Sequence, residues 1–398
     1  MLYTAEEVYE FVREEDVRFI RLAFCDINGR QKNVSIQPTE LRRAFEEGIS
    51  FDASAVYGFG DVEKSDLLLF PNPSTLNILP WRPSHGKVVR MFCDIRHPDG
   101  TPFERDSRLA LRRAVKRAAD MGITVQIGAE FEFYLFKTDE NGDPTKTPFD
   151  NAGYMDVAPE DKGENVRREI CLTLLDMGIV PECSHHEEGP GQNEIDFRYA
   201  DAMRAADDAM NFQTVVKATA QRNGLYADFS PKPLPHESGN GLHINLSLTA
   251  EDGADHLSAF MAGILDRIAE CTAFLNPTEE SYLRLGEKKA PRYISWSPEN
   301  RSPLIRIPAT GNERHRLEVR SPDPLANPYL AYALLIHAGL DGVERGLTPP
   351  PPVNCNLFCA GESVTSGLEA LPATLDDARK RARESAFIRK YLPEFLVF

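Results

Sequence analysis

The stretch IGAEFEFYLF, residues 127–136, says most about the fold of this 398-residue chain. Side chains alternate along a β-strand, so Glu130 and Glu132 point to one face while Phe131 and Phe133 point to the other. The aromatic face predicts a strand that packs on a hydrophobic core. The acidic face holds two carboxylates that repel each other, which predicts a positive charge between or above them.

Three later stretches add carboxylates, an imidazole, and arginines that alternate along another expected strand. They are HHEEGPGQNEIDF at 185–197 with Glu187 and Glu194, SGNGLHINLSL at 238–248 with His243, and RHRLEVRSPDP at 314–324 with Arg316, Glu318 and Arg320. Carboxylates with one imidazole suit hard divalent cations such as Mg²⁺ or Mn²⁺, and alternating arginines suit phosphate or carboxylate groups. Together the four stretches indicate metal-assisted phosphoryl transfer from a nucleotide.

Each of these residues also has a plainer interpretation. An E-x-E pair in a strand is usually a solvated face, and a single histidine such as His243 is more often a satisfied core residue than a ligand. Arg316 and Arg320 around Glu318 could form a surface ion-pair ladder, which contributes little stability. Glycines just before His243 permit close approach of the backbone to a ligand, and four such stretches together favour the metal and phosphate interpretation.

The composition is that of a globular protein, with 42% hydrophobic and 27% charged residues. The 45 basic and 61 acidic residues give a net charge of −16, which argues against a nucleic-acid or anionic-membrane partner. The seven cysteines are odd in number and include no C-x-x-C pair, so a disulfide framework is not expected and a reducing cytoplasm fits. No apolar run approaches the length of a membrane span, and the acidic N-terminus lacks a signal-peptide pattern.

Residues 1–100 are expected to form a small α+β domain. Thr4 and Glu7 have the spacing of a capping box, which predicts a short amphipathic helix. An Asn-Gly pair at 28–29 predicts a tight turn between two strands. A further helix is expected over residues 38–48.

Residues 101–398 are expected to form one large α+β catalytic domain. Its strands alternate with helical runs, of which the one at 256–275 is long and largely apolar and predicts a buried core helix. The proline-rich run at 348–353 predicts a stiff connector, and a helical tail is expected after it.

Seven segments, in order along the chain, resemble those of type I glutamine synthetases. They are FDASAVYGF (51–59), IGAEFEFYLF (127–136), HHEEGPGQNEIDF (185–197), PKPLPHESGNGLH (231–243), NPTEESYLRL (276–285), NRSPLIRIP (300–308) and LEVRSPDPLANPYLAYALLIHAGLDG (317–342). The resemblance implies a small β-grasp domain followed by a catalytic domain built around a curved antiparallel sheet. It also implies a ring-shaped homo-oligomer, commonly of two stacked hexamers, with active sites between neighbouring subunits.

The same resemblance implies a reaction in two steps. ATP phosphorylates the γ-carboxylate of glutamate, and ammonia then displaces phosphate from the γ-glutamyl phosphate. Two or more Mg²⁺ or Mn²⁺ ions per active site are implied as cofactors. In the family pattern Glu132, Glu187 and Glu194 match ligands of the ion on the glutamate side, and Glu130, His243 and Glu318 match ligands of the ion that clamps the ATP phosphates.

Residues outside the two ligand sets also match family positions. The resemblance implies catalytic roles for Asp52, Arg301, Arg320 and Glu287, glutamate contacts for Arg284, Gly239, Ser238 and Arg320, and ATP contacts for Arg306, Arg316, Ser247 and Asn245. Asp52 is expected to reach across the subunit boundary to the ammonium site. Arg301 and Arg306 match arginines on the transferring phosphate.

The sequence departs from the family pattern mainly on the amine side. The family carries a flap glutamate just before an Ala-Pro pair, which closes the site and takes a proton from the bound amine. Here the loop LGEKKAP (285–291) is one residue shorter and has Lys289 at that place, with Glu287 two residues away. Ser238 stands where the glutamate-binding loop usually carries asparagine. The family continues through further helices after the segment at 391–398, so weaker ring stacking is expected.

Three functions remain open on these residues. The first is glutamine synthetase, with Glu287 or another acid in the flap role. The second is a γ-glutamyl ligase for a different amine, because a lysine that faces the site would repel ammonium. The third is a non-catalytic protein that binds glutamate or ATP. The six retained metal-ligand residues argue against the third, since a site without turnover need not keep them.

Overall fold

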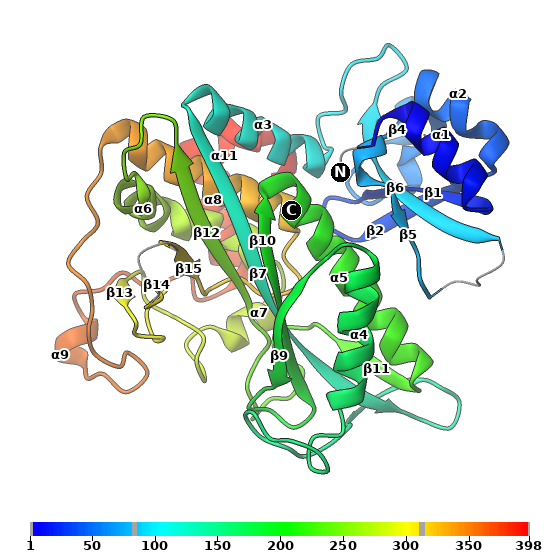
Figure 1. The fold of residues 1–398 in the computed structure, drawn as a ribbon. Helices are drawn as coiled ribbons and strands as arrows, with labels where there is room; N and C mark the ends of the chain where they lie inside the picture. The colour runs from blue at the N-terminus through cyan, green and yellow to red at the C-terminus, as the bar shows by residue number, and fades with distance from the viewer. Residues whose placement is uncertain (1–2, 82–85, 310–314, 397–398) are drawn as a thin grey trace.

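The computed structural model describes residues 3–81, 86–309 and 315–396, which form a small N-terminal unit and a larger C-terminal one (Figure 1). The N-terminal unit is a six-stranded sheet in the order β2-β1-β6-β4-β3, with β5 paired to β6. Its elements are α1 (Ala5–Glu14), β1 (Val17–Cys25), β2 (Gln31–Ile36), α2 (Leu41–Glu46), β3 (Ile49–Asp52), β4 (Asp66–Pro71), β5 (Asn77–Ile78) and β6 (Lys87–Arg96). Strands β1 and β6 are parallel, while β1 and β2 form an antiparallel hairpin.

Local signals in the N-terminal unit act largely as the sequence predicts. The capping box of Thr4 and Glu7 is present at the start of α1. The β1–β2 turn is closed by Asp26, whose side chain accepts the backbone N–H groups of residues 28 and 30, and Gly29 takes the left-handed conformation at φ 76°. The helix expected over 38–48 is shorter: a 3₁₀ turn leads into α2, and Gly48 at φ 79° ends it.

The C-terminal unit is built on a nine-stranded sheet in the order β13-β14-β15-β12-β7-β10-β9, and β8 and β11 also pair with β7. Its strands are β7 (Ile123–Thr138), β8 (Pro144–Pro148), β9 (Pro181–His186), β10 (Gln192–Asp201), β11 (Leu225–Asp228), β12 (Leu242–Ala250), β13 (Trp296–Pro298), β14 (Ile305–Ile307) and β15 (Leu317–Val319). All pairs are antiparallel except β13 with β14. The 16-residue β7 is therefore the central strand of the sheet, with which four other strands pair.

The helices of the C-terminal unit lie around this sheet. They are α3 (Ser107–Asp120), α4 (Glu164–Asp176), α5 (Ala202–Arg222), α6 (Leu257–Leu275), α7 (Glu279–Arg284), α8 (Pro328–Arg345), α9 (Glu362–Thr365), α10 (Leu375–Glu384) and α11 (Ala386–Tyr391). Of these helices, α3 and α5 contact β7 directly. Phe131 and Phe133 are buried, with ring centres 5.0 and 6.3 Å from Phe212 of α5. The predicted division of β7 into an aromatic and an acidic face is confirmed.

The apolar helix α6 lies against α8 in unusually close backbone contact. A Cβ on Gly263 of α6 would lie 2.2 Å from the carbonyl oxygen of Ala338, and one on Gly342 of α8 would lie 2.2 Å from that of Ala259. Both positions therefore need glycine. The buried core helix predicted at 256–275 is confirmed.

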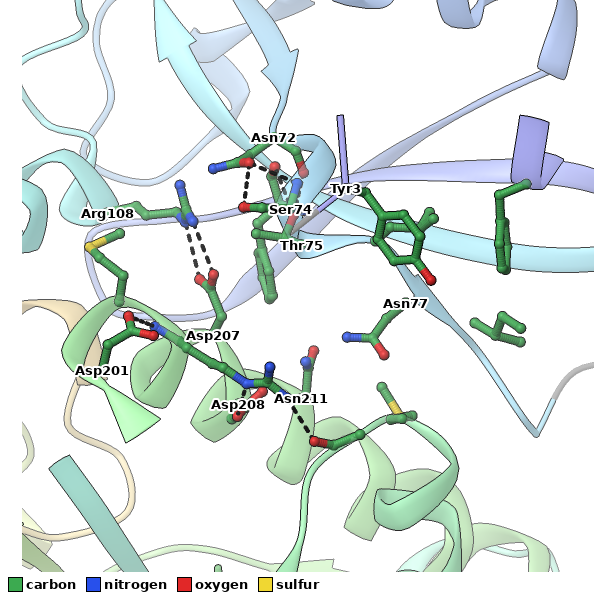
Figure 2. A pocket seen from close by; sticks show the side chains of 18 of the residues that line it. Tyr3, Asn72, Ser74, Thr75, Asn77, Arg108, Asp201, Asp207, Asp208 and Asn211 are labelled. Carbon is green, nitrogen blue, oxygen red and sulfur yellow. Dashed lines mark hydrogen bonds and ion pairs between the residues drawn. The ribbon is translucent and has the colours of Figure 1, made fainter. Parts of the chain in front are cut away.

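The two units meet at a charged seam beside a cavity of about 660 Å³ (Figure 2). Arg108 of α3 donates to both carboxylate oxygens of Asp207 on α5, at 3.1 and 3.0 Å, and to Asp94 of β6 at 3.2 Å. The hydroxyl of Tyr329 also donates to Asp207, at 2.6 Å. One buried guanidinium thus ties the N-terminal sheet to the helices of the larger unit.

Candidate active site

The acidic face of β7 meets ionisable groups on both neighbouring strands. Glu130 pairs with His243 of β12 on one side and with Asp196 of β10 on the other. Glu132 pairs with Glu194 of β10. Direct partners in an antiparallel ladder have Cβ atoms about 4.5–5.5 Å apart, so the strand register alone gathers these side chains.

Glu130, His243 and Glu318 form the first cluster, with ligand atoms all within 4.8 Å of one another. His243 Nδ1 lies 3.1 Å from Glu130 Oε2 and 3.8 Å from Glu318 Oε1. Burial alone would raise the pKa of Glu130, but the hydrogen bonds from His243 and Asn245 and the charges of His243 and Arg320 together outweigh burial and lower that pKa to about 2. These are the residues expected to hold the ion on the ATP side, and the fold brings all three together.

Among the described residues, Glu194 is shared by three further groups of possible ligands, one of which joins it to Glu130 and Asp196. Its ligand atoms group with those of Glu132 and His243, and separately with those of Glu187 and His185. His185 Nε2 lies 3.3 Å from Glu194 Oε1. The expected set of Glu132, Glu187 and Glu194 is therefore brought into one region, but as two overlapping groups that share Glu194 and add His185.

The carboxylates of these clusters are not fully neutralised by the surrounding protein. Burial, together with the charges of Glu194 and Glu187, raises the pKa of Glu132 to about 8. Burial also raises the pKa of Asp196 to about 9, and its Oδ1 has no hydrogen-bond partner in the described part of the chain. Crowded carboxylates with one imidazole are the donor set that Mg²⁺ and Mn²⁺ prefer. The residues therefore fit divalent cations.

Two of the expected phosphate-binding arginines form ion pairs with the carboxylate of Glu318. Arg306 Nη1 is 2.7 Å from Glu318 Oε2, and Arg320 Nη1 is hydrogen bonded to Glu318 Oε1. The buried Nε of Arg320 has no hydrogen-bond partner among the described residues. Arg301 is exposed, and its positive charge acts on the hydroxyl of Tyr154 by favouring the ionised form. Positive charge is thus placed directly beside the first cluster.

A small cavity of about 20 Å³ adjoins Glu132 and Glu187. Arg284, the residue expected to hold glutamate, lines it and is almost fully buried. Its guanidinium donates to the backbone carbonyls of Ser321 at 2.8 Å and Arg320 at 3.3 Å. These bonds fix the orientation of the arginine at the wall of the cavity.

The glycine-rich loop forms another wall of the same cavity. A Cβ on Gly239 would lie 2.4 Å from the carbonyl oxygen of Pro231, so a larger residue would move the loop. The carbonyl of Ser238 accepts the hydroxyl of Tyr134 at 2.6 Å, and its Oγ donates to Glu188 Oε2 at 3.3 Å. Ser238 and Gly239 are thus placed together where a contact to glutamate is expected.

A larger cavity, of about 500 Å³, opens beside the first cluster. It is lined by Asn245, Ser247 and Arg316, three of the four expected ATP contacts. Arg316 Nε donates to Asn245 Oδ1 at 2.9 Å. Arg306, the fourth, points to the carboxylate of the first cluster instead.

Sequence reasoning missed Cys183 and Asp196, which line the same larger cavity. Cys183 Sγ lies 2.6 Å from Asp196 Oδ2. A signal for Asp196 was present, because it follows Glu194 by two positions and therefore shares its face of the strand.

Lys289, rather than Glu287, faces the site. Lys289 Nζ lies 2.9 Å from Glu188 Oε1 and 3.8 Å from Glu187 Oε2. Glu287 is exposed, and its charge acts on Lys232. The structure does not bring Glu287 to the carboxylate clusters, so its catalytic role in the flap stays a prediction.

Asp52 stands apart from the clusters within this chain. It is exposed at the end of β3, where its side chain accepts the backbone N–H of Ser54 at 2.9 Å and the Ser54 hydroxyl at 2.6 Å. The loop that carries Asp52 belongs to the N-terminal unit. The expected role of Asp52 at the active site of a neighbouring chain stays a prediction.

His186, which directly precedes Glu187 in the chain, holds the backbone of Glu187 in place and does not join the carboxylate clusters itself. Its ring is fully buried, with Nε2 2.9 Å from Asp150 Oδ1 and Nδ1 2.6 Å from the carbonyl oxygen of Glu187. This pair of hydrogen bonds fixes the backbone of Glu187 at the edge of the sheet.

Comparisons with known proteins agree with the arrangement of the two units. Residues 16–98 match the glutamine synthetase β-grasp domain, and residues 104–397 match the glutamine synthetase catalytic domain. The glutamine synthetase of Clostridium saccharobutylicum is 45% identical over 405 residues, which cover 98% of this chain and 91% of that protein. The glutamine synthetase of Methanosarcina mazei is 45% identical over 406 residues, with the same coverage.

Solved structures show the same fold. GmaS in complex with ADP has a TM-score of 0.89 at 31% identity, covering 98% of this chain and 93% of that one. The glutamine synthetase of Plasmodium falciparum, solved by cryo-electron microscopy, has a TM-score of 0.86 at 24% identity, covering 99% and 93%. The predicted β-grasp and catalytic fold is confirmed. In the part of the chain that the structure describes, no helix has the length and apolar character needed to cross a membrane. The chain belongs to the glutamine synthetase family.

Proposed function

We propose that this protein is an ATP-dependent carboxylate–amine ligase that phosphorylates the γ-carboxylate of glutamate and transfers the γ-glutamyl group to ammonia, forming glutamine. The observation that carries this proposal is that the first cluster borders two different cavities. Glu130 lines the cavity of about 500 Å³ that holds three expected nucleotide contacts. His243 lines the small cavity that holds Arg284 and Gly239, expected for glutamate. The relatives named glutamine synthetase support the same activity.

Two divalent ions, Mg²⁺ or Mn²⁺, are the cofactors that these residues suit. Their ligands would be Glu130, His243 and Glu318 on the nucleotide side, and Glu132, Glu187 and Glu194 on the glutamate side. When bound, such ions neutralise phosphate charge and polarise the phosphoryl oxygens. The pKa of about 8 for Glu132 supports this assignment, because a buried carboxylate of that kind gains most from a cation.

The arginines supply positive charge from the protein itself. Arg306 and Arg320 converge on Glu318, and the Nε–H of Arg320, which has no partner among the described residues, is a donor for a ligand oxygen. Such preorganised donors stabilise the charge that spreads over a transferring phosphoryl group. In the second step the amine nitrogen attacks the acyl carbon, phosphate leaves with the electron pair of the broken C–O bond, and the amine loses a proton.

The site is proposed to be complete only in a homo-oligomer. Asp52 is the residue that would come from the neighbouring chain, since within one chain it lies in the N-terminal unit and its side chain accepts hydrogen bonds from Ser54. An exposed carboxylate on a short strand is well placed to reach a neighbour in a closed ring.

A γ-glutamyl ligase for another amine is the second candidate, and Lys289 is the observation that favours it. Its ammonium lies 3.8 Å from a carboxylate of Glu187. Two like charges about 4 Å apart cost roughly 4 kcal/mol at an effective dielectric near 20, so a free ammonium ion next to Lys289 would be disfavoured.

Phosphate release with glutamate, ATP and Mg²⁺ tests the function, with ammonium and a panel of primary amines as acceptors. We expect release that requires both glutamate and an acceptor. The best acceptor then separates glutamine synthesis from ligation of another amine. Release without glutamate, or none with any acceptor, would contradict the proposed function.

A further inference from the structure

The loop between α7 and residue 290 is held in a strained conformation over the small cavity. Lys288 has φ 26° and Lys289 has φ 66°, both in the left-handed region that side chains with a Cβ rarely adopt. Lys288 Nζ donates to the carbonyl oxygen of His236 at 2.6 Å and lies 3.4 Å from Glu237 Oε2. Two consecutive strained residues persist only where other contacts hold them. The contacts of the lysine side chains therefore offset the free-energy cost of the left-handed backbone.

The ammonium of Lys289 lies among the side chains of Glu187, Glu188 and Tyr154, which together form a cation cup. Glu188 Oε1 is 2.9 Å away, Glu187 Oε2 is 3.8 Å away, and the ring centre of Tyr154 is 4.7 Å away. Ser238 Oγ donates to the second oxygen of Glu188 at 3.3 Å and so orients it. Carboxylates joined to an aromatic face are a general recognition device for ammonium groups.

The cup and the small cavity share the same walls. Glu187, Ser238 and both lysines line that cavity, and its volume of about 20 Å³ has room for one water molecule. This volume is smaller than an amino acid, so glutamate can enter only if the walls of the cavity move. Lys289 therefore lies at the wall of the cavity assigned to glutamate, next to the cup.

We infer that Lys289 is a specificity-determining residue for the amine, because its side chain fills the cation cup of Glu187, Glu188 and Tyr154 that a protonated amine would otherwise take. This inference rests on the proposed function and deepens it. The competing cation is tethered to the loop, so its effective concentration at the cup is on the order of millimolar or above. Free ammonium must displace it, which raises the ammonium concentration that the enzyme needs.

The first test compares Lys289→Gln with Lys288→Gln. Each variant removes one positive charge from the same loop, but only Lys289 lies in the cup. We expect Lys289→Gln to lower the KM for ammonium at least tenfold, and Lys288→Gln to lower it far less. The KM for ATP should stay the same in both, because neither lysine lines the larger cavity assigned to the nucleotide. An unchanged ammonium KM in Lys289→Gln, or an equal drop in both variants, would overturn the inference, as would a loss of kcat in Lys289→Gln.

A second test does not depend on turnover. Removing a cation 3.8 Å from Glu187 should increase the affinity for Mn²⁺ several-fold, since Glu187 is an expected metal ligand. Calorimetric titration of Mn²⁺ into wild type and the two variants measures this. Tighter Mn²⁺ binding in Lys289→Gln, but not in Lys288→Gln, supports the inference that Lys289 occupies the cup. This result holds even if the protein proves to have no ligase activity. Equal affinities in all three proteins contradict it.

Discussion

Glu132 and Glu194 lie directly opposite each other in the antiparallel ladder of β7 and β10, so two mostly buried carboxylates share one face of the sheet. Like charges placed directly across a ladder destabilise it. The charges of His243 and Arg284 act against this repulsion, but burial and the neighbouring carboxylates keep the pKa of Glu132 near 8. The sheet therefore presents a carboxylate pair whose repulsion a divalent cation would reverse.

Replacing Glu132 by alanine should weaken Mn²⁺ binding and reduce turnover by at least ~100-fold, because one charged ligand is lost from the shared cluster. Titration calorimetry and phosphate release measure the two effects. Glu140→Ala is the matched control, since Glu140 is exposed on the turn that follows the same strand. An unchanged metal stoichiometry together with unchanged turnover would show that Glu132 is not a ligand.

Arg284→Lys should raise the KM for glutamate by roughly 10- to 100-fold and leave the KM for ATP nearly unchanged. Lysine keeps the charge but lacks the planar guanidinium of arginine. It therefore cannot bond both backbone carbonyls and a substrate carboxylate at once. Steady-state kinetics with each substrate varied in turn provides the measurement. A rise confined to ATP would move Arg284 to the nucleotide side.

Asp52 and Glu132 should complement each other between chains. If each active site combines the N-terminal unit of one chain with the catalytic unit of the next, Asp52→Ala and Glu132→Ala should both be inactive alone. Dissociated, mixed and reassembled, the two variants should regain about a quarter of wild-type activity, since random pairing joins two intact halves at that frequency. Activity no greater than the sum of the separate variants would place the whole site within one chain.

Asp208→Asn should stabilise the fold at pH 8 but not at pH 4. Burial raises the pKa of Asp208 from 3.8 to about 7, with Arg204 as its hydrogen-bond partner at 3.4 Å. The folded state thus binds more protons than the unfolded state between pH 4 and 7, and stability falls as pH rises through that window. The gain in free energy of unfolding at pH 8 should be roughly 2–4 kcal/mol. Denaturant unfolding at both pH values tests this, and equal effects would contradict it.

Features fixed by short-range signals were predictable from the sequence. The capping box of Thr4 and Glu7 placed the start of α1, and the aromatic and acidic alternation of residues 127–136 placed the faces of β7. The helix expected over 38–48 was too long at both ends, because Pro38 begins a 3₁₀ turn and Gly48 adopts a left-handed conformation.

Features set by strand register and loop packing were not predictable in this way. His185 joins Glu194 because β9 and β10 pair those two positions, which alternation within one strand cannot reveal. The contact of Lys289 with Glu188 depends on how the loop folds back over the sheet. The resemblance to a family located Lys289 as a departure, and the fold was needed to show which way it points.

The most direct test of the central claim follows oxygen from glutamate to phosphate. Glutamate labelled with ¹⁸O in its γ-carboxylate is incubated with the enzyme, ATP, Mg²⁺ and the best acceptor, and the released phosphate is analysed by mass spectrometry. The account predicts one ¹⁸O atom in each phosphate, because the γ-carboxylate oxygen bonded to phosphorus leaves with it. Unlabelled phosphate would contradict a γ-glutamyl phosphate route and with it the proposed ligase.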